Sequence, residues 1–220
     1  MLYSELPKMA RIVKADAEGA LVEAAAVLKG GGLVAYPSDT VYGLAAAAGD
    51  ARAVERVFAV KDRDAEKALS LLLADATDLT PLCAPVPFLA RVFAQHYWPG
   101  PLTLVLRCSP AFESAALGGG DTIAVRVPDH PFLRELIRAL GEPITGTSAN
   151  RSGRPACRSA QEVEQELGDA VELIIDGGPS REGPESTVVS LTGTLPTVLR
   201  EGAIPRVDVE RLGRTGMATA

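Results

Sequence analysis

Cysteine and histidine are scarce in this chain. Among its 220 residues there are three cysteines, Cys83, Cys108 and Cys157, and two histidines. The cysteines are widely spaced, odd in number and contain no CxxC pair, so they do not build the disulfide framework of a small secreted domain. The scattering of so few ligands also argues against the usual structural zinc sites, which need four cysteine or histidine side chains.

Long apolar runs and an excess of positive charge are absent as well. The longest apolar stretches, such as residues 71–74, are far shorter than a membrane span, and residues 1–19 lack the apolar core of a signal peptide. We therefore expect a protein of the reducing cytoplasm without membrane contact. The formal net charge of −6 excludes a basic footprint over the whole surface, while a local basic cleft for nucleic acid stays possible.

What is present is the composition of a globular domain, with 47% hydrophobic and 23% charged residues, which excludes a disordered chain. Strand and helix patterns are intermixed, and the last part is rich in strands, so we expect a mixed sheet flanked by helices. The patterns predict helices over residues 16–29, 51–58, 87–93, 130–140, 159–168 and 208–212, with a loose end at 215–220. They predict strands over residues 33–36, 68–73, 102–106, 122–127, 171–175, 187–191 and 197–200.

Two polar clusters interrupt the first half of the chain. The segment PSDTVYGL at 37–44 directly follows a buried strand, where hydroxyl groups can meet a ligand at the edge of a sheet, but Ser-Asp-Thr is also common in a simple capped turn. The segment KDRDAEK at 61–67 alternates cations and anions. Its Lys61, Arg63 and Lys67 can converge on a polyphosphate, or the segment can be a solvated loop that neutralises itself.

Two further features lie in the second half. Arg126 is set within the apolar strand at 122–127, and because an unpaired buried charge is costly it needs a partner, either a structural carboxylate or a ligand carboxylate. The segment GTSANRSGRP at 146–155 follows another expected strand, and its small residues would let backbone N–H groups approach an anion. A long surface turn is the alternative, since no Walker or GxGxxG motif accompanies it.

Taken together and in this order, these segments resemble the YrdC-type threonylcarbamoyl-adenylate synthases. The resemblance covers residues 16–202, leaving 1–15 as an N-terminal segment and 203–220 as a tail. It rests on seven segments in register: PSDTVYGL at 37–44, KDR with Lys67, WPGPLTLVL at 98–106, TIAVRVPDHP at 122–131, TSANRSGRPA at 147–156, STVV at 186–189 and LREG at 199–202.

The resemblance implies a three-layer αβα fold of the YrdC/RibB type, in which a twisted mixed sheet surrounds a deep cavity. It implies that L-threonine, bicarbonate or carbon dioxide, and ATP with Mg²⁺ give threonylcarbamoyl-AMP and pyrophosphate. Other proteins would then transfer the threonylcarbamoyl group to tRNA. No metal site built by the protein itself is implied.

The resemblance also implies roles for individual residues. Those expected to contact L-threonine are Thr40, Arg126, Gly146 and Ser186. Those expected around ATP are Lys61, Arg63, Lys67, Thr122, Ser148, Asn150, Ala156 and Arg200, of which Lys61 and Arg63 would act in catalysis.

The sequence departs from the family pattern at several places. Ser38 replaces a commoner Thr, Lys67 stands where many long-form relatives have Asn, and Leu72 stands where many place a His. We expect the extra C-terminal domain of the long forms to be absent. A double-stranded RNA or tRNA-binding module without synthase activity is the alternative function, and a carbamoyl-transfer domain like that of hydrogenase-maturation proteins is a third, although this chain lacks the zinc-finger cysteines of that architecture.

Overall fold

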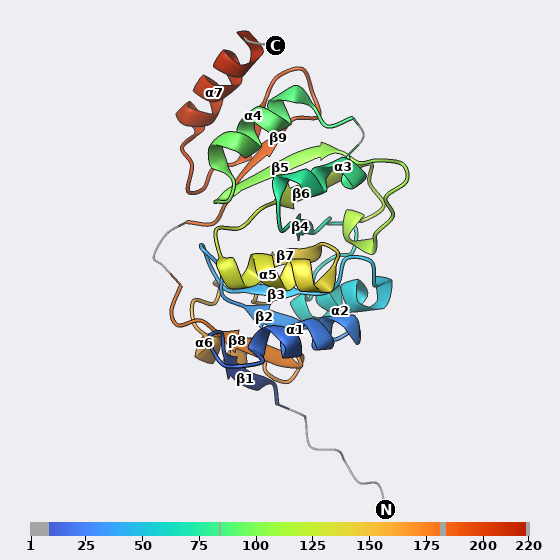
Figure 1. Cartoon of the computed structure of the whole chain (residues 1–220), viewed down its shortest axis with the longest axis vertical. Coiled ribbons are helices and arrows are strands. Elements are labelled where there is room, and N and C mark those ends of the chain that lie inside the picture. The colour runs from blue at the N-terminus through green and yellow to red at the C-terminus, as the bar shows by residue number, and fades with distance from the viewer. Residues whose placement is uncertain (1–8, 84, 181–183, 219–220) are drawn as a thin grey trace, which may run out of the picture.

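A computed structural model describes residues 9–83, 85–180 and 184–218 of the chain (Figure 1). Within these residues the helices are α1 (Ala20–Lys29), α2 (Ala51–Lys61), α3 (Leu79–Leu82), α4 (Phe88–Tyr97), α5 (Pro131–Leu140), α6 (Ala160–Leu167) and α7 (Arg206–Ala218). The strands are β1 (Arg11–Lys14), β2 (Val34–Tyr36), β3 (Gly43–Ala45), β4 (Ser70–Leu72), β5 (Leu102–Arg107), β6 (Thr122–Arg126), β7 (Ile144–Ser148), β8 (Leu173–Asp176), β9 (Thr187–Ser190) and β10 (Thr197–Arg200).

The ten described strands form one mixed sheet in the order β1-β8-β2-β3-β7-β4-β6-β5-β9-β10. Four neighbouring pairs are parallel, namely β1 with β8, β2 with β8, β4 with β6 and β5 with β9. The other five pairs are antiparallel. The expectation of a mixed sheet is confirmed, and its centre brings together strands that lie far apart in the sequence.

Helices cover both faces of the sheet, because alternate strand residues point to opposite sides. In and beside β2, Val34 and Tyr36 pack in a smaller apolar cluster with α1 and α5, which lie side by side in Figure 1. Leu33 and Ala35, which alternate with these two residues, belong to a larger cluster that includes residues of α2, α4 and α6. This arrangement confirms the predicted three-layer αβα fold.

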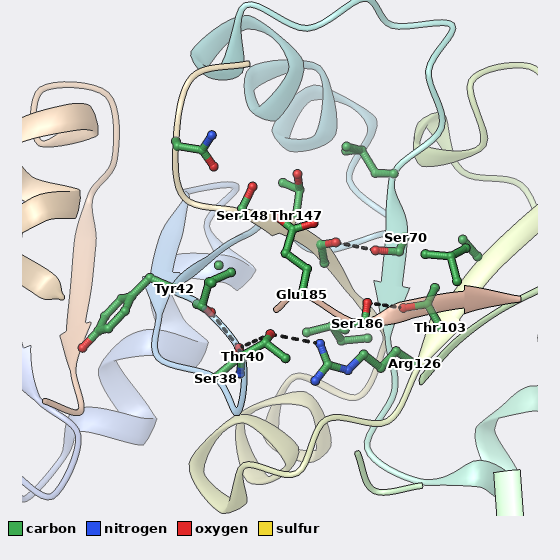
Figure 2. Close-up of a pocket in the computed structure, with 18 of the residues that line it drawn as sticks. Ser38, Thr40, Tyr42, Ser70, Thr103, Arg126, Thr147, Ser148, Glu185 and Ser186 are labelled. Atoms are coloured by element: carbon green, nitrogen blue, oxygen red, sulfur yellow. Dashed lines mark hydrogen bonds between the residues drawn. The ribbon is translucent and has the colours of Figure 1, made fainter. Parts of the chain in front are cut away.

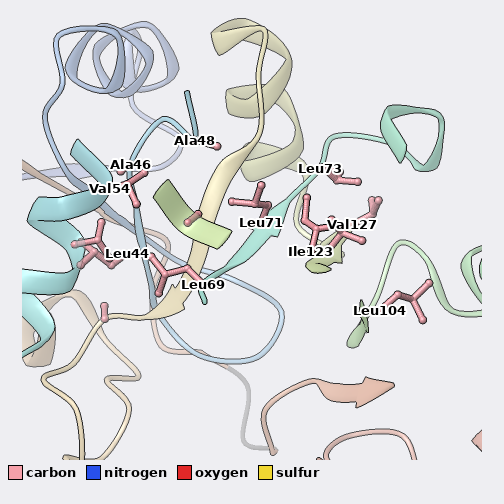
Figure 3. Packing of buried hydrophobic residues seen from close by; sticks show 14 of the residues in the cluster. Leu44, Ala46, Ala48, Val54, Leu69, Leu71, Leu73, Leu104, Ile123 and Val127 are labelled. Carbon is pink, nitrogen blue, oxygen red and sulfur yellow. The ribbon is translucent and has the colours of Figure 1, made fainter. Parts of the chain in front are cut away.

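The larger cluster forms the main core and crosses the middle of the sheet (Figure 3). Leu69, Leu71 and Leu73 of the β4 segment contribute every second residue to it, and all three are almost fully buried. Val54 from α2 packs into the same cluster, as expected from the helical periodicity. Burying each such side chain contributes about 1.5–3 kcal/mol, so this layer holds the central strands rigidly in place.

Capping groups and glycines set several helix ends. The carboxylate of Asp50 accepts from the backbone N–H groups of Arg52 and Ala53 at 3.0 and 3.1 Å, so it caps α2. Gly141 ends α5 with a positive φ of 86°, a conformation that favours glycine. The first predicted helix begins at Ala20 and not near residue 16, because the preceding Gly19 has a φ of 83°.

Two strands and two helices differ from the expectations. The sequence predicted no helix at α3 and no strand at β1 or at β3, which overlaps the end of the PSDTVYGL segment at residues 43–44. Helix α7 is longer than the short helix predicted at 208–212 and includes residues 215–218, which were expected to be loose. Figure 1 shows α7 beside α4, at the end of the molecule away from β1.

Among the described residues, no helix combines the length and the apolar character that crossing a membrane requires.

Candidate active site

A cavity of about 450 Å³ opens on the sheet face that also carries α1 and α5 (Figure 2). Its floor is made by strand residues that alternate with core residues, such as Ser70 between Leu69 and Leu71. Gly43, Ala124 and Gly146 line the same space. Because the side chains at these positions are small, the sheet surface is left open here instead of being filled by packing.

The cavity brings together most of the residues that the sequence singled out. Those that line it are Thr40, Lys61, Arg63, Arg126, Gly146, Ser148, Asn150, Ser186 and Arg200. They come from segments separated by up to 160 residues, and the strand order places these segments next to one another. The polar segments for which a simple turn or surface loop was the alternative therefore contribute to the wall of the same cavity.

Three expected site residues lie outside the cavity wall. Lys67 is exposed, and the loop that carries it is held through its backbone carbonyl, which accepts from Arg63 Nε at 3.1 Å. Thr122 begins strand β6, four residues and about 13 Å of extended chain from Arg126. Ala156 is half-buried. These three residues are therefore not among the described residues that line the cavity.

Arg126 anchors one end of the cavity. Its side chain is 8% exposed, and its Nη2 pairs with Asp39 Oδ2 at 2.6 Å. Nη1 donates to Thr40 Oγ1 at 3.3 Å, and Nε donates to the Gly100 carbonyl at 2.9 Å. The sequence left open which carboxylate pairs with Arg126; in the structure it is the side chain of Asp39. Since a guanidinium has five N–H groups, two remain for a ligand carboxylate.

Lys61 provides a buried cation at another part of the wall. It is the last residue of α2, is 2% exposed, and donates from Nζ to the carbonyl oxygens of Ser148 and, at 2.7 Å, Asn150. One N–H is left for a ligand. Burial, followed by the nearby Arg63 charge, lowers the pKa of Lys61 to about 8. The ammonium is therefore held where an anion would be strongly attracted.

Arg63 shapes the loop next to Lys61. The chain turns after α2 through Asp62, whose φ is 50°, and Arg63 then donates to the carbonyl oxygens of Lys67 at 3.1 Å and Ala68 at 3.0 Å. These bonds fold the predicted cationic segment onto the start of β4. Lys61 and Arg63 thus share the cavity wall, while Lys67 faces outward.

Gly146 is required by close packing at the cavity floor. A Cβ atom at this position would lie 2.8 Å from Leu72 Cδ2 and 3.2 Å from Ser70 Oγ, so the site has no room for a larger residue without movement. Farther along the segment, Asn150 Nδ2 donates to the carbonyl oxygens of Arg151 and Arg154 at 3.0 and 2.7 Å. The TSAN segment is therefore a rigid rim and not a free surface turn.

Sequence reasoning missed several cavity residues. Ser70 belongs to no local motif, Thr103 lies inside the WPGPLTLVL segment but had no predicted role, and Glu185 stands directly before the STVV segment. Ser70 Oγ donates to the Gly146 carbonyl, and Arg200 pairs with Glu185. Period-two alternation along β4 and β5, combined with the strand order, is the signal that would have revealed Ser70 and Thr103.

The chemistry of the wall is that of anion binding. Glu185 is the one carboxylate among the described residues that line the cavity. In the described part of the chain, no three His, Cys, Asp or Glu side chains gather as a metal site would require. Burial raises the pKa of Cys157 to about 11, and Glu162 and Glu166 act in the same direction, so this thiol is not an activated nucleophile.

Fold and site together define a mixed α/β protein with a cavity whose described lining suits anionic small molecules. A family model, Sua5/YciO/YrdC with the description "Telomere recombination", matches residues 26–202. The chain therefore belongs to the Sua5/YciO/YrdC family. This membership agrees with the resemblance carried by the seven sequence segments.

Individual relatives support the same relationship. The chain is 40% identical over 191 residues to a threonylcarbamoyl-AMP synthase of Bacillus subtilis and 43% identical over 189 residues to one of Pyrococcus abyssi. Each match covers 86% of this chain but 55% and 56% of the relatives, so the chain spans just over half of their length. The structure of P. abyssi Sua5 complexed with L-threonine aligns with a TM-score of 0.87 at 40% identity, over 93% of this chain and 60% of that one.

Proposed function

We propose that this chain is an L-threonylcarbamoyladenylate synthase, which converts L-threonine, bicarbonate or carbon dioxide, and ATP into threonylcarbamoyl-AMP and pyrophosphate. The observation that carries the proposal is the shared cavity wall, on which Arg126, Thr40 and Ser186 occur together with Lys61 and Arg63. One group suits a small amino acid and the other a polyphosphate. The names of the relatives and the L-threonine complex of the P. abyssi protein support the assignment.

The amino-acid substrate would bind beside Arg126. Its carboxylate would accept from the two remaining guanidinium N–H groups, and Thr40 and Ser186 would supply further hydroxyl contacts. The threonine would lie against Gly146, where a side chain would narrow the space.

The triphosphate would bind between Lys61 and Arg63 and the rim formed by Ser148 and Asn150, with Arg200 on the nucleotide side. Arg63 offers a forked guanidinium, while Lys61 acts as a point charge in a buried setting. Lys67, Thr122 and Ala156, which are outside the cavity wall, would contact the nucleotide only at its periphery.

The reaction would proceed in two steps. The threonine amine attacks the carbon of carbon dioxide and loses a proton, giving an N-carboxylate. An oxygen of that carboxylate then attacks the α-phosphorus of ATP, and the bond to the β-phosphate oxygen breaks to release pyrophosphate. Holding the two reactants together can supply roughly 7–11 kcal/mol of the barrier. Lys61 and Arg63 would stabilise the charge that develops on the phosphates.

Magnesium would enter with ATP. The wall offers one carboxylate, Glu185, which already pairs with Arg200, so the residues present fit an ion held mainly by phosphate and water oxygens. When bound, the ion would supply charge neutralisation at the phosphates. The product is a reactive mixed anhydride, so proteins that transfer its threonylcarbamoyl group to tRNA are the expected partners.

Incubation with radiolabelled bicarbonate, L-threonine, ATP and Mg²⁺ tests the proposal. Labelled threonylcarbamoyl-AMP and pyrophosphate should form together and disappear when threonine is omitted. Arg126→Met should chiefly raise the KM for threonine, and Lys61→Met the KM for ATP, whereas Arg107→Met, at an exposed ion pair outside the cavity, should change neither. Wild-type protein that forms no labelled product, and binds tRNA tightly instead, would favour the RNA-binding alternative.

A further inference from the structure

Two hydroxyl groups, one on β5 and one directly before β9, meet on the cavity wall. Thr103 Oγ1, from the second residue of β5, lies 2.9 Å from Oγ of Ser186, the residue directly before β9 (Figure 2). Both residues line the cavity, and their exposed fractions are 5% and 6%. The neighbouring Leu102 and Leu104 are fully buried in the main core, so Thr103 points to the opposite, cavity side of its strand.

Arg200 binds the same serine from another direction. Its Nη2 donates to Ser186 Oγ at 3.2 Å and to the Ser186 carbonyl at 2.9 Å, and its Nε donates to that carbonyl at 3.2 Å. Glu185 pairs with Nη1 and holds the guanidinium in this orientation. An arginine can only donate, so one lone pair of Ser186 Oγ is occupied by Arg200.

The Ser186 hydroxyl keeps one hydrogen-bonding position for a ligand. A hydroxyl has one donor and two acceptor positions, of which Arg200 takes one and Thr103 takes a second. One position is therefore left for a ligand in the cavity. Because Thr103 is β-branched and lies within a paired strand, its own χ1 is restricted. The Ser186 hydroxyl is thus held in one orientation before any ligand binds.

We propose that Thr103 is a positioning residue for the amino-acid substrate, acting through the hydroxyl of Ser186. The inference rests on the proposed function, in which Ser186 contacts L-threonine. Thr103 does not touch the substrate itself. It fixes the orientation of the Ser186 hydroxyl so that its one remaining hydrogen-bonding position faces the cavity. The contact between Ser186 and the substrate then forms without a change of side-chain rotamer.

The test compares Thr103→Val, which keeps the shape but removes the hydroxyl, with Thr103→Ser, which keeps the hydroxyl. Calorimetry would measure the Kd for L-threonine, and pyrophosphate release would measure KM and kcat. The valine variant should raise the Kd and KM for threonine about five- to tenfold, as expected for one hydrogen bond in a buried setting, with the KM for ATP nearly unchanged. The serine variant should restore threonine binding to near the wild-type value.

Two controls separate positioning from a general structural effect. Ser190 and Thr192 form a second hydroxyl pair at 2.9 Å outside the cavity wall, so Thr192→Val matches the perturbation without touching the site. In the Ser186→Ala background, Thr103→Val should add no further loss of threonine affinity, because its effect passes through Ser186. If Thr103→Val does not fold, Thr103→Ala carries the same test.

The outcomes are distinct. Wild-type protein that neither binds threonine nor releases pyrophosphate would overturn the proposed function itself. An active wild type whose Thr103→Val variant keeps the threonine Kd and KM would overturn only the role of Thr103. A variant that weakens threonine and ATP equally, or a loss that persists undiminished in the Ser186→Ala background, would also overturn it by showing a structural effect.

Discussion

Removing Asp39 should destabilise the protein strongly, although the carboxylate lies outside the cavity wall. Asp39 and Arg126 are 12% and 8% exposed, and they pair at 2.6 Å. Asp39→Ala leaves the Arg126 charge buried, with only Thr40 and the Gly100 carbonyl as neutral partners. Leaving one member of a buried pair uncompensated costs about 3–5 kcal/mol. For a chain of this length, we expect Tm to fall by about 6–20 °C.

Urea unfolding followed by circular dichroism measures this loss. The double variant Asp39→Ala with Arg126→Met removes both charges, so it should be more stable than Asp39→Ala alone. Asp121→Ala, which breaks a pair whose side chains are 64% and 77% exposed, serves as the matched control and should change the unfolding free energy by less than about 1 kcal/mol. If Asp39→Ala is as stable as that control, the argument that Arg126 needs a buried counter-charge is refuted.

Three further predictions follow from the site. The pKa of Lys61 is lowered to about 8, so the KM for ATP should rise as pH increases through 8, and Lys61→Arg should keep the KM flat in a pH titration. The unfolded chain holds that proton up to about pH 10.5, so the unfolding free energy contributed by Lys61 should increase between pH 8 and 10.5. Gly146→Ala should raise the KM for threonine and lower the free energy of unfolding by about 1–3 kcal/mol, and in a Leu72→Ala background, which is itself destabilised by the lost core side chain, the further loss caused by Gly146→Ala should be smaller; an unchanged Tm for Gly146→Ala alone would contradict the close packing. Iodoacetamide at pH 7.5 should leave Cys157 unmodified in the folded protein, because burial raises the pKa of its thiol to about 11; mass spectrometry would detect the contrary result.

The sequence predicted the elements whose signals are local. Helix α2 has a capping Asp50 and an apolar stripe, and strand β10 matches its predicted range from Thr197 to Arg200. Strand β1 has no such signal, because its four residues become a strand only by pairing with β8, about 160 residues later. Helix α7 is longer than predicted and contains two glycines, Gly213 and Gly216. In the structure they lie close to Pro196 and to Leu89 and Val92, where the absence of a side chain permits tight packing.

The site shows the same division between local and long-range information. Motifs within short segments pointed to Arg126, Lys61 and the 146–155 rim, and the cavity contains all three. They could not reveal Asp39 as the partner of Arg126, since 87 residues separate the two. Nor could they assign a role to Thr103, although it lies in the WPGPLTLVL segment, because strand order alone brings β5 beside β9 and Thr103 to Ser186.

A crystal structure of the chain with L-threonine and a non-hydrolysable ATP analogue would show where each substrate binds. Both ligands should occupy this cavity, with the threonine carboxylate on Arg126 and the triphosphate on Lys61 and Arg63. The threonine amine should face the α-phosphate, with room for one carboxylate between them. An amino acid or a nucleotide bound elsewhere, with the cavity left empty, would contradict the proposed synthase site.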